Sequence, residues 1–311
     1  MTAPRLVLLQ TSPRVAPGLL TLEAWDLLRA GPVFCADPEL PVVDAVRQAG
    51  VPVTVAASPD EAAAAAAAGG RAVWLGESAV DVSGAAVDVV TVAGSYDLPG
   101  SRLLDAVAVM DRLRSPGGCP WDAKQTHESL APYLLEEAYE AYQALEDGDV
   151  GTDLREELGD VLLQVLFHAR LAAERADTGW TIDDLAAGLV DKLVRRHPHV
   201  FGDVSVADAD AVEANWDAIK AEEKQRTSVT DGVPLGQPAL SLVAKLVGRA
   251  QKAGLPTALA DADRGASGED LIGRALFGIA ARAKADGVDP EAALRTTARA
   301  YLATLQAAEK S

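Results

Sequence analysis

Two short acidic motifs contain the residues of this chain best suited to chemistry. Glu137 and Glu140 are three residues apart in the first motif, and Glu157 and Asp160 have the same spacing in the second. Two residues with this spacing share one face of a helix, where like charges destabilise it. Each pair also lies among apolar residues, so the four carboxylates cannot all ionise unaided. A hard dication relieves this repulsion because Mg²⁺ binds carboxylate oxygens. The spacing therefore predicts a site for Mg²⁺, with Mn²⁺ as the alternative ion.

Two other interpretations of the acidic motifs compete with metal binding. Glutamate-rich helix surfaces are common, and one such motif alone is usually a solvated face. The second motif favours metal binding, since Gly159 would allow two helices to approach closely just before Asp160. A redox di-iron bundle would need Glu-x-x-His pairs. His168 follows Glu157 by eleven residues, and this spacing excludes the di-iron alternative.

Basic and aromatic residues form a second candidate set further along the chain. Lys192, Arg195 and Arg196 lie at the end of one predicted helix, whereas Trp216 and Lys220 share a face of the next. Cationic groups near an acidic metal cluster suit a polyphosphate, and an aromatic ring nearby suits a nucleobase. The structural alternatives are that Arg196 and His197 cap the C-terminal end of their helix and that Trp216 belongs to the core.

Long amphipathic helices must position both sets. The spacing of apolar residues predicts helices over 103–113, 132–145, 153–175, 182–196 and 209–225. The connection over 146–152 is short enough for an antiparallel hairpin that brings the two acidic faces together. Residues 98–233 are therefore predicted to form an all-α bundle.

The regions on either side of this bundle differ from it in composition. Residues 1–97 alternate short β-branched runs with helical patterns, which predicts a small α/β domain with a mostly parallel sheet. The turn after its first strand, Gln10 to Arg14, lacks the glycines of a phosphate-binding turn, so we expect a non-catalytic packing domain. Residues 234–311 begin as a linker and continue as Ala-rich helices over 240–253, 270–285 and 290–308.

Composition limits the function classes further. The chain has 311 residues, with 28 Lys and Arg against 46 Asp and Glu, and a formal net charge of −18. We do not expect so acidic a chain to bind a nucleic-acid polymer, which would require a basic face. Its two cysteines, Cys35 and Cys119, are too few for a disulfide framework, which favours a cytoplasmic location. No run of about 20 apolar residues is present, so we expect no contact with a membrane interior.

Together, the motifs resemble the MazG family of nucleoside triphosphate pyrophosphohydrolases over about residues 101–226. The matching motifs are Arg114–Asp122, Gln125–His127, Leu135–Glu140, Leu154–Asp160, Lys192–Phe201 and Trp216–Lys220. The resemblance implies a mainly α fold, a homodimer, and hydrolysis of a nucleoside triphosphate to a nucleoside monophosphate and pyrophosphate. It also implies a house-cleaning role that removes non-canonical or damaged nucleotides.

The resemblance further assigns roles to individual residues. It implies four Mg²⁺ ligands, which are Glu137, Glu140, Glu157 and Asp160. It implies contacts to the triphosphate or the base from Lys192, Arg196, Trp216 and Lys220; Trp121 and Arg195, in the same motifs, complete the predicted substrate site. Mg²⁺ would polarise the α-phosphate and lower the pKa of the water that attacks it. Either Glu136 or one of the metal-binding carboxylates would accept the proton from that water.

The flanking regions also resemble parts of family members. Residues 1–97 resemble a shortened, degenerate remnant of the tetrapyrrole-methylase-like domain that precedes the helical module in some members. Residues 234–311 resemble a second catalytic module without a metal site. In this second module Arg274 stands where Asp160 stands in the first, and Leu271 stands where Glu157 stands.

Two functions compete with hydrolysis. One is a regulatory protein that senses nucleotides or metals without hydrolysing them, and the other is methyl transfer to a tetrapyrrole. The four acidic ligands, together with Lys192 and Lys220, favour hydrolysis over sensing. The missing glycine-rich turn in residues 1–97 disfavours methyl transfer.

Overall fold

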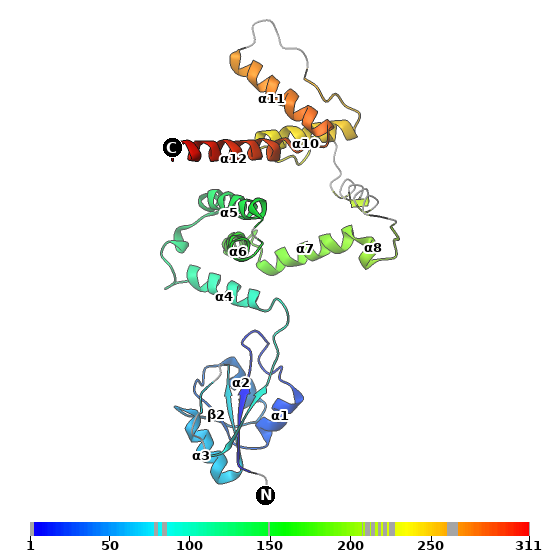
Figure 1. The fold of residues 1–311 in the computed structure, drawn as a ribbon. Coiled ribbons are helices and arrows are strands. Elements are labelled where there is room, and N and C mark those ends of the chain that lie inside the picture. The colour runs from blue at the N-terminus through cyan, green and yellow to red at the C-terminus, as the bar shows by residue number, and fades with distance from the viewer. Residues whose placement is uncertain are drawn as a thin grey trace. The chain divides into compact units, whose positions relative to one another are not determined.

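The computed structural model divides the chain into two compact units, Met1–Gly188 and Leu189–Ser311. It describes residues 3–77, 80–82, 86–148, 150–206, 208, 212, 215, 216, 219, 223, 228–259 and 267–310. The first unit holds the predicted α/β region and the start of the predicted helical bundle (Figure 1). The predicted domain boundaries near residues 97 and 233 stay a prediction.

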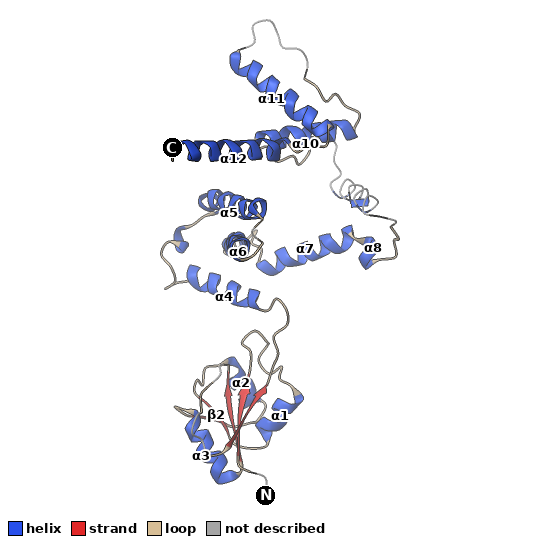
Figure 2. Ribbon diagram, viewed as in Figure 1, coloured by secondary structure: helices blue, strands red, loops and turns tan. Residues whose placement is uncertain are grey.

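The N-terminal region is built around a five-stranded parallel sheet, which confirms the predicted α/β layer (Figure 2). The strands are β1 Arg5–Gln10, β2 Val33–Cys35, β3 Val53–Val55, β4 Arg71–Gly76 and β5 Asp88–Ala93. Their order across the sheet is β3-β2-β4-β1-β5. The short β-branched runs of the sequence thus form strands close to their predicted positions, with β1 in contact with both β4 and β5.

Helices cover the sheet because its strands are apolar on both faces. In β1, Val7 and Leu9 pack into a core with helices α1 (Leu22–Arg29) and α2 (Pro41–Gln48). Leu6 and Leu8 alternate with them and pack into a second core with α3 (Pro59–Gly69). The alanine run of α3 ends at Gly70, which has a φ of 87° that favours glycine. All four β1 side chains are buried, so this region has a core of its own.

Arg14 connects this α/β region to the helices that follow. Its guanidinium donates to Asp97 at 2.6 Å and to Asp105 at 2.9 Å, and the Arg14 side chain is largely buried. Asp105 lies in the first turn of α4 (Arg102–Arg114). The hydrogen bonds from Arg14 lower the pKa of both carboxyls. A network of ion pairs therefore spans the domain boundary predicted near residue 97.

Long helices form the rest of the first unit. After α4 come the 3-10 turn η1 (Asp122–Lys124), α5 (His127–Asp147) and α6 (Thr152–Ala173), and α7 (Ile182–Arg196) begins near the end of the unit. The helices α5 and α6 form the predicted hairpin across a short connection and pack closely. Their core, shared with α4, consists of Met110, Leu130, Leu166, Phe167 and Leu171.

The helix α5 begins at His127, whereas the sequence predicts a start at Pro132. A reciprocal cap explains the difference. The Thr126 hydroxyl accepts from the Ser129 amide at 3.2 Å, and the Ser129 hydroxyl accepts from the Thr126 amide at 2.9 Å. This capping box satisfies two free amides of the first turn and starts the helix despite the proline inside it.

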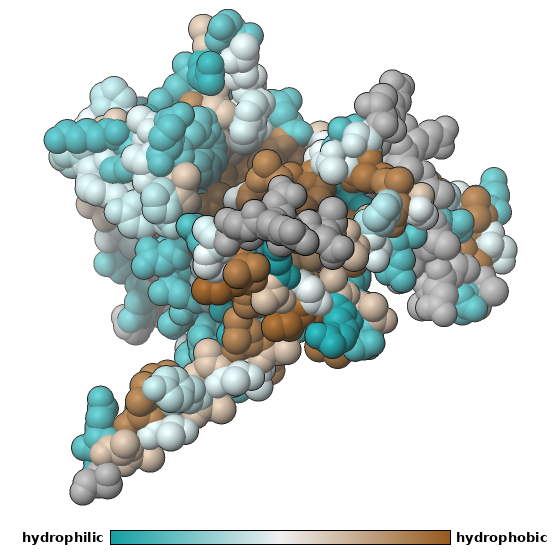
Figure 3. Space-filling view, turned by 90° about the horizontal axis from the view of Figure 1, so that it is seen from above, coloured by the Kyte–Doolittle hydropathy of each residue, from teal (hydrophilic) through white to brown (hydrophobic). Residues whose placement is uncertain are grey.

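The second unit contains the end of α7, the short α8 (Pro198–Phe201), and three helices that contact one another, α10 (Ala239–Lys252), α11 (Gly268–Ala285) and α12 (Pro290–Glu309). These three agree with the Ala-rich helices predicted after residue 240, whereas most of the predicted helix 209–225 lies outside the described residues. Hydrophobic side chains lie on the molecular surface among hydrophilic ones (Figure 3). No described helix is long and apolar enough to cross a membrane.

Candidate active site

The hairpin of α5 and α6 brings three of the four predicted metal ligands together. Glu137 extends from α5, and Glu157 and Asp160 extend from α6. One carboxylate oxygen from each lies within 4.8 Å of the others. We call these three residues the carboxylate cluster. The hairpin thus brings Glu137 of α5 against two α6 carboxylates that are three residues apart.

Glu140 and Glu136 adjoin this cluster. The Glu140 carboxyl shares a hydrogen bond with Glu137, and its charge acts on Glu157. Glu136 is exposed and adds negative charge beside Glu137. The fourth predicted ligand therefore lies next to the cluster, and Glu136 lies at its edge.

The carboxylates of the cluster repel one another. Desolvation, the hydrogen bond with Glu140 and the charge of Asp160 raise the pKa of Glu137. Desolvation and the charges of Glu140 and Asp160 likewise raise the pKa of Glu157. None of the ion pairs among the described residues joins a lysine or arginine to these four carboxylates. Within the part of the chain that the structure describes, these like charges are therefore held together without a compensating lysine or arginine.

A hard divalent cation fits this donor set. All of the converging atoms are carboxylate oxygens, the ligands that Mg²⁺ and Mn²⁺ prefer. Two of the three side chains are half-buried and the third is exposed, which leaves space for water or substrate. An ion at this position would reverse the upward pKa shifts of Glu137 and Glu157.

Gly159 does not have the predicted role in helix contact. A Cβ atom added at this glycine would meet no described atom within 4 Å. The helices therefore approach one another elsewhere, and the expectation of a close approach at Gly159 is wrong. The glycine is exposed and directly precedes Asp160 in the sequence.

A histidine pair ties the same two helices together further along the hairpin. The Nδ1 atoms of His127 and His168 are 2.8 Å apart, and the rings stack with centroids separated by 5.0 Å. Burial, and then the charge of His127, lower the pKa of His168. One ring must be unprotonated at Nδ1 to accept from the other. His168 of α6 thus contacts a histidine of α5.

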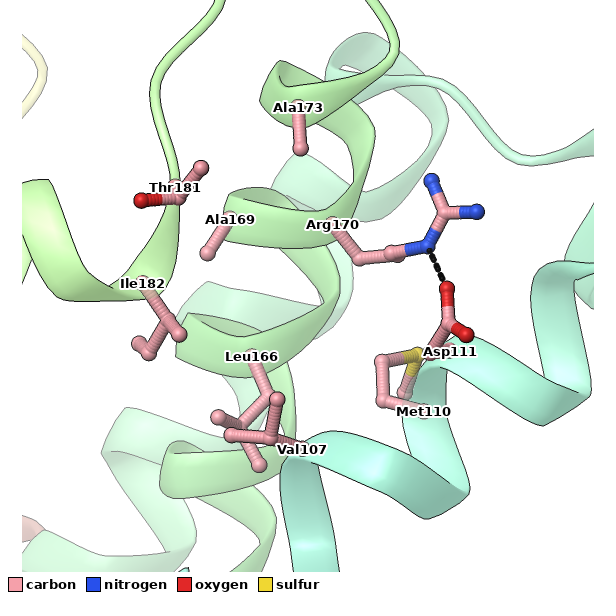
Figure 4. A pocket seen from close by; sticks show the side chains of 9 residues that line it. All are labelled: Val107, Met110, Asp111, Leu166, Ala169, Arg170, Ala173, Thr181 and Ile182. Carbon is pink, nitrogen blue, oxygen red and sulfur yellow. Dashed lines mark hydrogen bonds and ion pairs between the residues drawn. The ribbon is translucent and has the colours of Figure 1, made fainter. Parts of the chain in front are cut away.

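A small apolar pocket lies on the opposite face of α6 (Figure 4). It is lined from α4 by Val107 and Met110, from α6 by Leu166 and Ala169, and from α7 by Ile182, with the Asp111–Arg170 ion pair of 2.7 Å at its edge. Its volume of about 190 Å³ is below the roughly 300–1,000 Å³ of ordinary ligand pockets. Helical spacing places these α6 residues away from Glu157 and Asp160, so the pocket is not part of the carboxylate cluster.

The predicted substrate residues are divided between the two units. Trp121, in the first unit, is half-exposed and packs edge-on against Tyr133 and Phe167 at centroid distances of 6.2 and 6.5 Å. Lys192 is exposed on α7. Lys220 lies outside the described residues.

Arg195, Arg196 and Trp216 lie together in the second unit. Both arginines bind one carboxylate, that of Glu223, with closest distances of 2.6 Å. The Arg196 guanidinium also lies over the Trp216 ring, 5.3 Å from its centroid. Arg196 therefore makes an ion pair and a ring contact. His197 contacts the Leu193 carbonyl near the helix end through Nδ1 at 2.6 Å.

Comparison with known proteins supports these observations. A family model described as the MazG nucleotide pyrophosphohydrolase domain matches residues 125–201, which include the hairpin and the end of α7. The chain is 55% identical over 223 residues to an uncharacterized 26.1 kDa protein of Streptomyces cacaoi, covering 71% of this chain and 88% of that one.

Two relatives have descriptive names. A nucleoside triphosphate pyrophosphohydrolase of Mycobacterium tuberculosis is 46% identical over 212 residues, 68% of this chain and 59% of that protein. The nucleoside triphosphate pyrophosphohydrolase/pyrophosphatase MazG of Thermotoga maritima is 39% identical over 215 residues, 64% of this chain and 82% of that protein. The match thus spans less than two-thirds of the mycobacterial protein.

A helical hairpin with converging carboxylates defines a class of helical protein with an acidic site between two helices. With relatives of this identity and coverage, the chain belongs to the MazG family of nucleotide pyrophosphohydrolases.

Proposed function

We propose that this protein hydrolyses nucleoside triphosphates to nucleoside monophosphates and pyrophosphate. The convergence of Glu137, Glu157 and Asp160 within 4.8 Å, without a cationic partner among the described residues, is the observation that carries this proposal. Such a cluster is unfavourable alone and becomes favourable when it binds a cation. The names of the mycobacterial and Thermotoga relatives support the same reaction.

In the proposed mechanism, carboxylates of this chain hold the metal ion and accept the proton. Glu137, Glu157 and Asp160, with Glu140 beside them, would hold Mg²⁺ or Mn²⁺. A divalent cation supplies positive charge for the phosphate oxygens and makes water more acidic. Glu136, or a carboxylate of the cluster, accepts the proton of the attacking water.

Separate groups bind the nucleotide in this proposal. Lys192, Arg195 and Arg196 bind phosphate oxygens, because a guanidinium offers paired N–H donors to an oxyanion. Trp121 and Trp216 provide aromatic faces for the base, each being accessible at the surface of its own unit. Lys220 keeps its predicted role at the triphosphate.

We propose a homodimer as the working form. The outer surface of the hairpin exposes large apolar side chains, including Leu135, Leu145 and Leu158, each more than half-exposed. A second copy that covers them would bury apolar area, which is favourable at about 25 cal/mol per Å². We further propose a cytoplasmic location and a house-cleaning role, consistent with two free cysteines and a nucleotide substrate.

The flanking regions have supporting roles in this proposal. The parallel sheet of residues 1–97 agrees with a reduced tetrapyrrole-methylase-like domain that has no catalytic part. Residues 234–311 are proposed to be a second module without a metal site, since Arg274 of α11 forms an ion pair with Asp270 at 2.9 Å.

A screen of substrates tests the proposed reaction. The full chain is incubated with canonical, deoxy and oxidised nucleoside triphosphates, and pyrophosphate and orthophosphate are quantified separately, with Mg²⁺ or with a chelator. We expect one pyrophosphate per monophosphate, no orthophosphate, and loss of turnover in the chelator. Release of orthophosphate, or binding of nucleotides without turnover, would contradict the proposal; the latter result would identify a sensor.

A further inference from the structure

A single carboxylate binds both arginines at the end of α7. The Nε atom of Arg195 donates to Oε1 of Glu223 at 2.6 Å. Nε and Nη2 of Arg196 donate to Oε2 of Glu223 at 3.1 and 2.6 Å. Both oxygens of one side chain are therefore bound by two guanidinium groups.

These groups are fixed by their surroundings. The side chain of Arg196 is 10% exposed and that of Glu223 is 18% exposed, whereas Arg195 is 55% exposed. Trp216 lies against the Arg196 guanidinium, and the ring of His197 packs edge-on against Trp216 at a centroid distance of 4.9 Å. Hydrogen bonds from Arg196 and Arg195 lower the pKa of Glu223 to about 2. Glu223 is thus an anion at any ordinary pH.

The chemistry of this contact is that of an oxyanion on a guanidinium pair. Carboxylate and phosphate oxygens are bound by the same planar N–H donors, often two at a time. A carboxylate held by two arginines therefore stands where a phosphoryl group would bind. It carries one negative charge, whereas a triphosphate carries several.

We propose that Glu223 is an internal anion that occupies the polyphosphate-binding arginines and is displaced when a polyphosphate binds. This inference rests on the proposed function, which assigns Arg195 and Arg196 to the phosphates. Glu223 lowers the affinity for every anion, since its contacts must be given up first. A highly charged triphosphate compensates for this loss better than a singly charged anion does, so the carboxylate favours polyphosphates.

The test measures binding without hydrolysis. Inorganic tripolyphosphate is titrated calorimetrically into the full chain in a chelator, which removes any contribution from divalent ions. Wild type is compared with Glu223→Gln and with Asp191→Asn, a control that removes an exposed carboxylate from α7, the helix that carries Arg195 and Arg196. Glu223→Gln should bind about tenfold more tightly, since a charge-assisted contact no longer competes, and Asp191→Asn should change affinity by less than about twofold.

A second measurement reports on the arginine site itself. Tripolyphosphate should change the part of the tryptophan fluorescence that is lost in Trp216→Phe, because Trp216 contacts Arg196. This readout in the wild type does not depend on how well Glu223→Gln folds. Equal or weaker binding by folded Glu223→Gln, or tripolyphosphate binding without a response from Trp216, would overturn the inference. If Glu223→Gln binds more tightly but no nucleoside triphosphate is hydrolysed, the proposed function fails and the internal anion stands.

Discussion

The helices α6 and α11 share a glycine-centred pattern but differ in how their charges are balanced. In α6, Gly159 precedes Asp160, and Glu157 and Asp160 join Glu137 without a cationic partner among the described residues. In α11, Gly273 precedes Arg274, which donates to Asp270 one turn earlier at 2.9 Å. The first arrangement gathers like charges, and the second pairs opposite charges on one surface.

In the proposed function, this difference separates a binding site on α6 from a packing element on α11. A cluster of like charges lowers stability until a ligand binds, so a fold that keeps it is organised around that ligand. An exposed ion pair on one helix is satisfied by itself and contributes little. Residues on α11 such as Leu271 and Ile272 are more than half-exposed, which suits a packing surface.

The largest effect is expected from changing the acidic residue of each helix. Asp160→Asn removes a carboxylate from the cluster, and pyrophosphate release by the full chain should fall at least about 100-fold. Arg274→Asp, at the matching position of α11, should leave the rate within about twofold and create no second site. Hydrolysis that survives in Asp160→Asn and is lost only with a further change beyond residue 240 would contradict the comparison.

A smaller effect is expected on stability in the absence of metal. Because the pKa of Glu137 is raised, the folded protein binds this proton more tightly than the unfolded chain does. Stability is therefore lost as the pH rises through the raised pKa. In a chelator, Glu137→Gln should melt a few degrees above wild type at about pH 7.5, and the difference should be much smaller at about pH 4, where Glu137 is mostly protonated in both states. Equal melting temperatures at both pH values would show that the cluster is not strained.

Glycine-to-alanine substitutions test whether α6 and α11 make close contacts at their matching glycines. A Cβ atom at Gly159 or Gly273 would meet no described atom within 4 Å. Alanine at either position should therefore raise the free energy of unfolding by about 0.5–1 kcal/mol. Gly118→Ala is the contrasting control, since its Cβ would lie 2.2 Å from the Leu113 carbonyl oxygen, and it should lower stability clearly. Chemical denaturation of the three variants measures these changes. A lower stability of Gly159→Ala would indicate that Gly159 does lie at a close helix contact.

The smallest effect is expected from the α11 ion pair. Arg274→Gln removes the charge contact with Asp270. The Arg274 side chain is 34% exposed and the Asp270 side chain is 44% exposed. An exposed pair one turn apart contributes about 0.3–0.5 kcal/mol, and the change should disappear in high salt. Denaturation of Arg274→Gln at low and high salt measures it; a loss several times larger would mean that Arg274 has more than a surface role.

Local patterns predicted the elements of this fold but not its long-range contacts. The α7 bounds agree with the helix predicted over 182–196, because its apolar residues recur at helical spacing. The carboxylates of α5 and α6 were found for the same reason, since spacing fixes which residues share a face. The start of α5 was misplaced, because the cap at Thr126 outweighs the signal of Pro132.

Contacts between distant residues had no signal in the sequence. Glu223 lies 27 residues from Arg196, and His127 lies 41 residues from His168. Neither spacing belongs to a helix or a turn, so only the packing of separate segments brings these groups together. The sequence of α6 alone likewise does not show whether Gly159 lies at a helix contact, because the distance between two helices depends on the side chains of both.

The most direct test of the account compares two adjacent glutamates. Glu157 belongs to the carboxylate cluster, whereas its neighbour Glu156 is exposed and outside it. Pyrophosphate release from nucleoside triphosphates is measured over a range of Mg²⁺ concentrations for wild type, Glu157→Gln and Glu156→Gln. We expect the rate of Glu157→Gln to fall at least about 100-fold and to lose its dependence on Mg²⁺. The rate of Glu156→Gln should stay within about threefold of wild type. Wild-type Mg²⁺ dependence in Glu157→Gln, or equal losses in both variants, would contradict a catalytic site on the α5–α6 hairpin.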